Sequence, residues 1–136
     1  MSDTRAADVA AIRAVLAESY RAWEAGDATA MVADYTEDAT AILPGSLRDG
    51  REAVRASMDL AFAGPLKSTS TWNRTLGIRF LGRDAALVVN ESGILFGGAS
   101  EVPDAHKVYA TWVLEKRDGR WLIAAYHNSP MHLPTA

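Results

Sequence analysis

Three side chains in this sequence could take part in proton-transfer chemistry: His127, Glu91 and Arg74. His127 lies near the end of the last apolar segment, and an imidazole can exchange a proton near neutral pH because its ordinary pKa is about 6.5. Glu91 and Arg74 lie on two segments whose alternating pattern predicts strands. A charge on an apolar sheet face is costly unless it is paired with another charge or has a function. Glu91 could act as a general base and Arg74 could hold developing negative charge. The alternatives are a buried structural ion pair and a hydrogen-bonded histidine.

Four aromatic side chains could form the wall of a ligand site. Tyr20 and Trp23 end the first helical segment, and Trp72 and Trp112 lie on strand-like segments. Such side chains around a concave cavity would suit a polycyclic or polyene ligand. The alternative is that each of them belongs to the hydrophobic core.

The sequence lacks the residue patterns that metal binding, cofactor binding and thiol chemistry require. The chain has no cysteine, and its three histidines do not show the paired spacing of a metal site. Asp34, Glu37 and Asp38 fall where a helix meets a strand, which capping and solvation explain. No Gly-rich phosphate-binding loop is present. We therefore expect neither a metal nor a cofactor.

Length and charge limit the class of protein. The 136 residues are expected to form one domain over 1–136. A formal net charge of −3 and a pI near 5.5 argue against a nucleic-acid partner. No apolar stretch reaches the roughly 20 residues of a membrane span, and the first residues lack the apolar segment of a signal peptide. We expect a cytoplasmic protein with no membrane partner.

A C-terminal hairpin organises the predicted sheet. Segments 105–117 and 120–130 alternate as strands and are separated by Asp118-Gly119, which favours a type I′ turn because both central residues need positive φ. A two-residue loop sets a register that puts His127 on the same face as Trp112. Both faces of this hairpin are apolar, so we expect helices to cover one and another protein surface to cover the other.

The N-terminal half is predicted to be mainly helical. Apolar residues at helical spacing predict a helix over 5–25, a short helix that Asp27 caps, and a third helix that ends at Gly64-Pro65. A short strand over 39–43 separates the second helix from the third.

Two further strands are predicted over 68–81 and 85–97, where the sequence period changes to two. A turn centred on Arg83-Asp84 would place Arg74 one diagonal step from Glu91 on an otherwise apolar face. If Arg74 and Glu91 instead faced solvent or a dimer partner, the prediction that they act in a pocket would be wrong.

Five short motifs lie at the ends of these elements: Trp23-Glu-Ala-Gly-Asp27, Tyr35-Thr-Glu-Asp-Ala39, Gly50-Arg-Glu-Ala-Val54, Asp118-Gly-Arg-Trp121 and His127-Asn-Ser129. Together with the order helix, short helix, strand, helix and four long strands, they resemble the nuclear transport factor two-like superfamily over nearly the whole chain. Within it the chain looks most like the SnoaL-like branch. More narrowly it resembles the SgcJ/EcaC family, some members of which belong to enediyne antibiotic biosynthesis.

The resemblance implies an α+β fold in which a curved antiparallel sheet forms a cone around three N-terminal helices, in the order ααβαββββ. It also implies a pocket between helices and sheet, and commonly a homodimer through the convex face of the sheet. The family includes polyketide cyclases, ketosteroid isomerases, dehydratases and many members without assigned catalysis. Its cyclases and isomerases rely on a pocket Asp, whereas the aspartates of this sequence fall near helix ends, turns or loops.

We therefore expect a pocket for a hydrophobic, carbonyl-bearing polyketide-like intermediate. One hypothesis is cofactor-free cyclisation, isomerisation or dehydration, in which Glu91 or His127 moves a proton and Arg74 holds negative charge. The alternative is a non-catalytic module that sequesters or delivers a hydrophobic metabolite, and a third is a scaffold that only dimerises. An open pocket with an unpaired Glu91 or His127 would favour the enzyme, and a filled pocket would favour the scaffold.

Overall fold

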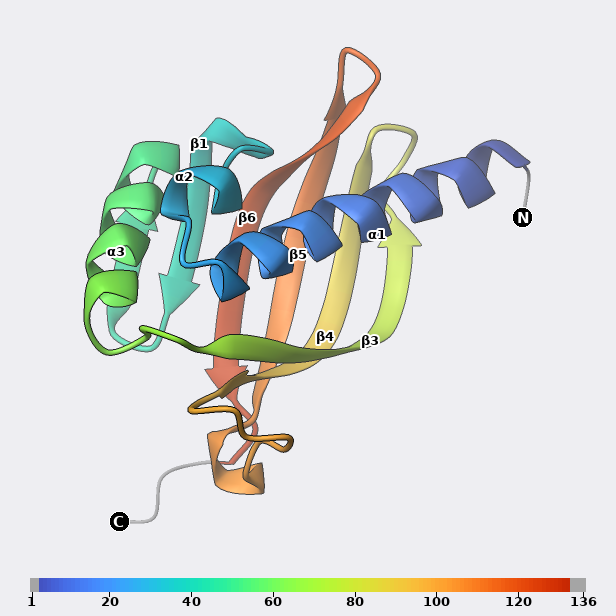
Figure 1. Cartoon of the computed structure of the whole chain (residues 1–136). Helices are drawn as coiled ribbons and strands as arrows, with labels where there is room; N and C mark the ends of the chain where they lie inside the picture. The colour runs from blue at the N-terminus through green and yellow to red at the C-terminus, as the bar shows by residue number, and fades with distance from the viewer. Residues whose placement is uncertain (1–2, 133–136) are drawn as a thin grey trace.

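Three helices lie against one face of a curved six-stranded sheet in the part of the chain that the structure describes, residues 3–132 (Figure 1). The structure is a computed structural model, and the predicted domain limits at residues 1 and 136 lie outside the described residues. The elements are α1 (Asp3–Glu24), α2 (Ala28–Met31), β1 (Tyr35–Leu43), β2 (Ser46–Asp49), α3 (Arg51–Ala63), β3 (Ser70–Phe80), β4 (Ala85–Leu95), the 3₁₀ turn η1 (Asp104–His106), β5 (Val108–Arg117) and β6 (Arg120–Pro130).

The predicted α+β class and element order are confirmed. The strands lie in the order β2-β1-β6-β5-β4-β3, and all neighbours pair antiparallel except β1 and β6, which are parallel. The structure adds the short strand β2, which pairs with β1 across the turn at Pro44-Gly45. Residues 46–49 therefore form the second strand of a hairpin before α3 begins.

Helix α1 lies across the sheet, and its apolar side packs against the sheet to form part of the hydrophobic core. Ile12 is fully buried and packs in the same cluster as Leu114 and Ile123 of the two central strands. The short helix α2 begins where a side chain replaces a missing backbone partner: the Oδ1 of Asp27 accepts a hydrogen bond from the backbone N–H of Ala30 at 3.0 Å. The predicted cap at Asp27 is confirmed.

The turn between β5 and β6 has the predicted backbone, with φ of 52° at Asp118 and 77° at Gly119. The pairing follows the predicted register from this turn as far as Leu114 opposite Ile123. The type I′ geometry matches the right-handed twist of the two strands, which is why these residues start the hairpin in the predicted register.

A β-bulge at Ala124 then shifts the register by one residue, so that Trp112 lies opposite Tyr126. Because one extra residue reverses the alternation of every side chain beyond it, Tyr126 and Asn128 share the face of Trp112, and His127 lies on the opposite face. The prediction that His127 shares the face of Trp112 is wrong. We call the face with Trp112 the pocket face and the opposite face of the sheet the outer face.

The turn between β3 and β4 also differs from its prediction. Three residues separate Leu81 from Ala85, and the N–H of Leu81 donates to the carbonyl oxygen of Ala85 at 2.9 Å. The predicted turn had one residue fewer, and a second irregularity lies between Thr75 and Gly77. Arg74 is therefore directly opposite Glu91 instead of one diagonal step away. The pair lies on the outer face, because Asn73 and Ser92, the neighbouring residues on each strand, line the pocket.

Candidate functional site

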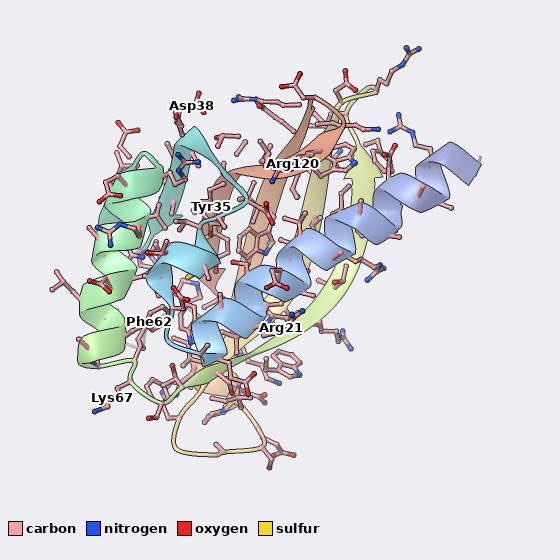
Figure 2. All side chains as sticks on the ribbon, turned by 45° about the horizontal axis from the view of Figure 1, so that its top comes forward. Arg21, Tyr35, Asp38, Phe62, Lys67 and Arg120 are labelled. Atoms are coloured by element: carbon pink, nitrogen blue, oxygen red, sulfur yellow. The ribbon has the colours of Figure 1, made fainter. Side chains whose placement is uncertain are left out.

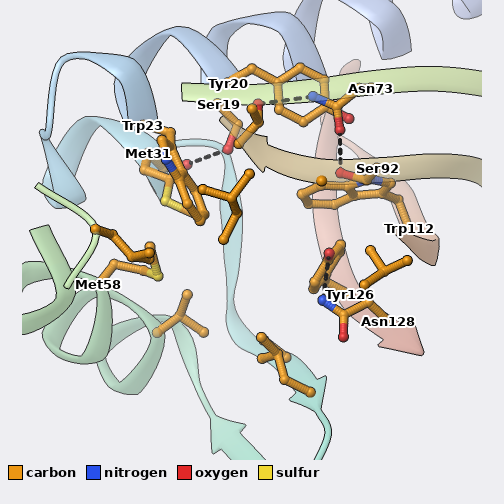
Figure 3. Close-up of a pocket in the computed structure, with 18 of the residues that line it drawn as sticks. Ser19, Tyr20, Trp23, Met31, Met58, Asn73, Ser92, Trp112, Tyr126 and Asn128 are labelled. Carbon is orange, nitrogen blue, oxygen red and sulfur yellow. Dashed lines mark hydrogen bonds between the residues drawn. The ribbon is translucent and has the colours of Figure 1, made fainter. Parts of the chain in front are cut away.

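A cavity of about 250 Å³ lies between the helices and the pocket face of the sheet (Figure 3). This volume is just below the usual range for small-molecule sites. All three helices and all six strands contribute to its lining. The wall is mostly apolar and includes Trp23, Met31, Val54, Met58, Val108 and Trp112. A cavity of this kind favours a ligand with a compact hydrophobic body.

Three of the four predicted aromatic residues line this cavity: Tyr20, Trp23 and Trp112. The ring of Trp112 is nearly buried and contacts Tyr20 edge-on, with centroids 6.1 Å apart. Trp23 is fixed because its Nε1 donates to the Oγ1 of Thr69 at 3.0 Å. Trp72, in contrast, lies on the outer face, where the Nζ of Lys107 is 5.0 Å from its ring centroid. The prediction that Trp72 faces the pocket is wrong, because the irregularity between Thr75 and Gly77 reverses the alternation of β3 and turns Trp72 away from the side on which Ile78 and Phe80 pack.

Tyrosine hydroxyls paired with asparagine amides give the pocket its hydrogen-bond donors. The Nδ2 of Asn128 donates to the hydroxyl of Tyr126 at 3.0 Å, and the Nδ2 of Asn90 donates to the hydroxyl of Tyr20 at 2.9 Å. Each phenol oxygen accepts in its pair, so each hydroxyl hydrogen can donate to a ligand. Burial raises the pKa of Tyr20 to about 12 and raises the pKa of Tyr126 and of Tyr35 as well. These phenols stay protonated at neutral pH.

Three further polar side chains of the pocket wall, on β3 and β4, bind one another. The Oγ of Ser92 donates to the Oδ1 of Asn73 at 2.8 Å, and the Nδ2 of Asn73 donates to the Oγ1 of Thr71 at 2.9 Å (Figure 3). Among the residues that the structure describes, the buried Oδ1 of Asn128 has no hydrogen-bond partner. It could therefore accept a hydrogen bond from a ligand hydroxyl.

Arg48 is the charged residue among the pocket residues that the sequence analysis missed, which also include Tyr126 and Asn128. It lies on β2 opposite Ala41 of β1, and both residues line the cavity because opposite residues share a face. Its Nη1 donates to the Sδ of Met58 at 3.3 Å. Within residues 3–132 no carboxylate oxygen lies within ion-pair distance of its guanidinium. The signal in the sequence was the turn pair Pro44-Gly45, after which a second hairpin strand is expected.

The charge of the pocket lining is positive. The lining residues within the described chain include Arg48 but no Asp or Glu side chain. The charge of Arg48 acts to lower the pKa of Tyr126 and of Tyr35, but burial raises both by more. Tyr35 lies inside the fold, whereas Asp38 of the same strand lies at its edge (Figure 2). The site can therefore donate hydrogen bonds and hold negative charge, and it presents no carboxylate base.

The three residues predicted to do proton-transfer chemistry lie outside this pocket. His127 is exposed on the outer face. Arg74 and Glu91 form an ion pair of 2.6 Å on the same face, with 66% of the Arg74 side chain and 17% of the Glu91 side chain exposed. Their predicted position in the pocket is wrong for the register reasons given above, and the pairing itself matches the structural alternative. His106 is exposed and borders the cavity.

The acidic residues after α2 make ion pairs with nearby arginines. Asp34 accepts from Arg120 at 2.8 Å, and Glu37 lies 3.7 Å from Arg51. Across the described residues no group of three or more His, Asp or Glu side chains is arranged to hold a metal ion. Nor is any helix in residues 3–132 long and apolar enough to cross a membrane.

The family model described as a SnoaL-like domain matches residues 12–133, which is most of the chain. The chain belongs to the SnoaL-like domain family. A comparison with curated proteins gave no match for this SnoaL-like protein. The predicted membership of the SnoaL-like branch is confirmed.

Solved structures with the same fold support this assignment. A domain of unknown function with a cystatin-like fold from Nostoc punctiforme is 26% identical, with a TM-score of 0.84 and coverage of 93% of this chain and 79% of that one. An NTF-2 like protein from Shewanella oneidensis is 24% identical, with a TM-score of 0.75 and coverage of 90% and 98%. A hexachlorocyclohexane dehydrochlorinase from Novosphingobium barchaimii is 16% identical, with a TM-score of 0.78 and coverage of 96% and 92%. The last two similarities concern the fold alone.

Proposed function

We propose that this SnoaL-like protein binds a small hydrophobic, carbonyl-bearing metabolite in its pocket and sequesters or delivers it. The observation that carries the proposal is the open apolar cavity of about 250 Å³ whose polar groups are mainly hydrogen-bond donors. An apolar body would fill the space between Trp23, Met58 and Trp112, and a carbonyl oxygen would accept from Arg48 or a tyrosine hydroxyl. The lining residues that the structure describes include no carboxylate base, which favours binding over proton transfer.

Polyketide intermediates fall within this ligand class, because they combine an apolar carbon skeleton with carbonyl oxygens. The resemblance to the SgcJ/EcaC family supports this choice, including an intermediate of enediyne biosynthesis. The small volume limits the part of the ligand held inside to about one or two rings. Tyr20, Trp23 and Trp112 are the aromatic residues that we propose contact it.

Proton-transfer chemistry on the same ligand is a second candidate function. One observation favours it: the imidazole of His106 borders the cavity and could accept a proton from a bound molecule. The dehydrochlorinase that shares this fold is consistent with such chemistry. In this candidate Arg48, instead of Arg74, would hold the negative charge that develops on a carbonyl oxygen.

Titration of the protein with 2-acetylnaphthalene in an isothermal calorimeter tests the binding function. We expect saturable binding, and we expect Val108→Trp to weaken it by about tenfold or more because the larger side chain fills the cavity. Tyr109→Trp is the matched control, since the next residue of β5 points to the outer face. Equal weakening by both variants, or no binding by the wild type, would contradict the proposal.

Incubation with a panel of aromatic polyketides separates the two candidate functions. Chromatography and mass spectrometry of the recovered compounds should return them unchanged if the protein is a binding module. A product that forms only with the wild-type protein, and not with Val108→Trp, would instead support catalysis in this pocket.

We also propose that the outer face packs against a second copy of the chain. Tyr109 and Ile42 are 50% and 44% exposed on this face, and exposed large apolar side chains favour association. Light scattering of the wild type should give twice the mass of the chain, and Tyr109→Glu should give the monomer because it introduces a charge into the interface. Leu60→Glu is the control, because Leu60 is 76% exposed on α3, away from the outer face. A monomeric wild type would refute the dimer.

A further inference from the structure

Arg48 is held on the pocket face by its position in the β1–β2 hairpin. Ala41 lies opposite Arg48, and both Ala41 and Leu43 line the cavity. Leu47, the preceding residue of β2, is 66% exposed and points to the other side. Turning Arg48 outward would require a one-residue shift of the strand, which would move Leu47 into its place. The fold therefore keeps a positive charge at this wall of the pocket.

Among the residues that the structure describes, the guanidinium of Arg48 has no carboxylate partner, whereas neighbouring arginines have one. Arg51 and Arg55, which follow on α3, lie 3.7 Å and 2.6 Å from the carboxylates of Glu37 and Glu52. Arg48 has five N–H donors, and the hydrogen bond that the structure shows goes to the thioether of Met58, a weak acceptor. Because a half-buried cation beside apolar walls is costly without a partner, the pocket favours a ligand that supplies negative charge.

The surroundings of Arg48 suit a carboxylate better than a single carbonyl oxygen. A guanidinium donates two parallel hydrogen bonds to the two oxygens of a carboxylate, and a ketone can accept at one oxygen only. The hydroxyl hydrogen of Tyr126, which is not used in the pair with Asn128, can donate to the same group. No Asp or Glu side chain among the described lining residues would repel an anion.

We infer that the ligand of this pocket is a small hydrophobic carboxylate whose anionic end is bound by the guanidinium of Arg48. This inference rests on the proposed function, because it names the chemical class of the molecule that the same pocket binds. The apolar part of the ligand lies between Trp112 and Met58, and Arg48 supplies the charge that selects it.

Two probes of nearly the same shape test the inference: 2-naphthoate and 2-acetylnaphthalene, which has a methyl group in place of one carboxylate oxygen. At pH 7, where a carboxylic acid is ionised, calorimetric titration of the full chain should give about tenfold tighter binding of 2-naphthoate. Arg48→Met should abolish this preference by weakening the binding of 2-naphthoate more than that of the ketone, because the apolar contacts that both probes share remain. Arg48→Lys should retain part of the preference, because it keeps the charge but loses the second parallel hydrogen bond.

Arg79→Met is the control for removal of an arginine charge elsewhere, since Arg79 is exposed on β3 away from the cavity. It should keep the full preference for 2-naphthoate. Equal affinity of the wild type for both probes would overturn the inference and leave the proposed binding function standing. If neither probe binds the wild type, both the inference and the proposed binding function are overturned. If Arg48→Met fails to fold, Arg48→Lys decides: a smaller preference for 2-naphthoate than that of the wild type supports the inference, and an unchanged preference overturns it.

Discussion

Replacing Trp112 by alanine is expected to lower the free energy of unfolding by about 3–5 kcal/mol and to abolish ligand binding. Trp112 is 5% exposed, and its ring lies 4.4 Å from that of Tyr126 and 6.1 Å from that of Tyr20, measured between centroids. Truncation removes one of the two tryptophan side chains of the pocket wall and leaves two aromatic neighbours without their packing partner. Urea denaturation followed by circular dichroism measures the stability, and calorimetric titration measures the binding.

Trp72→Ala is the matched control for this change. Trp72 is half-buried on the outer face, and its identified ring contact is with Lys107, a cation–π interaction worth about 0.5–1 kcal/mol. We expect it to cost about 1 kcal/mol of stability and to leave binding unchanged. A stability loss for Trp72→Ala equal to that for Trp112→Ala would mean that the pocket wall does not depend on Trp112 as described.

Asp8→Asn is expected to lower the free energy of unfolding by about 2–3 kcal/mol at pH 7. Asp8 of α1 is 7% exposed, and one carboxylate oxygen accepts from the Nε1 of Trp121 at 3.0 Å and from the Nζ of Lys116 at 3.1 Å. This carboxylate joins the first helix to the last two strands. The amide keeps the shape of the side chain but leaves Lys116 without its negative partner. Urea denaturation at pH 7 measures the loss.

The same residue predicts a pH dependence. The hydrogen bond from Trp121, with help from Lys116, holds the pKa of Asp8 below its usual range, although burial acts in the opposite direction. A carboxylate with a lowered pKa stabilises the folded state above its unfolded-state pKa of about 3.9, and this contribution is lost as the pH falls through the folded-state value. The stability difference between wild type and Asp8→Asn should therefore narrow as the pH is lowered below about 4.

An exposed acidic residue of the same helix provides the control. Glu18 forms an ion pair of 2.8 Å with Arg21, and more than half of each side chain is exposed. Glu18→Gln should change the stability by less than about 0.5 kcal/mol at any pH, because such pairs are screened by solvent. A difference between wild type and Asp8→Asn that stays constant with pH would show that the charge of Asp8 contributes nothing.

Local sequence rules predicted the elements of the fold and much of the apolar wall. Asp118-Gly119 specifies its turn through the backbone conformation that those two residues adopt, and Asp27 caps α2 through its own side chain. Tyr20 and Trp23 follow from the helical spacing of α1. Each of these features depends on residues close together in the chain, so the sequence alone determined them.

The polar chemistry of the pocket depended on which face each strand presents, and only the tertiary structure decided that. One extra residue, Ala124, places Tyr126 and Asn128 in the pocket and His127 on the outer face. The Ala-Ala sequence at this point carries no signal for a bulge. The irregularity between Thr75 and Gly77 likewise places Arg74 on the outer face, although Ile78 and Phe80 of the same strand pack against the core. Because strand side chains alternate with a period of two, a single inserted residue reverses every position beyond it. The class of fold was therefore readable from the sequence, whereas the positions of the charged and hydrogen-bonding groups were set by pairing between distant segments.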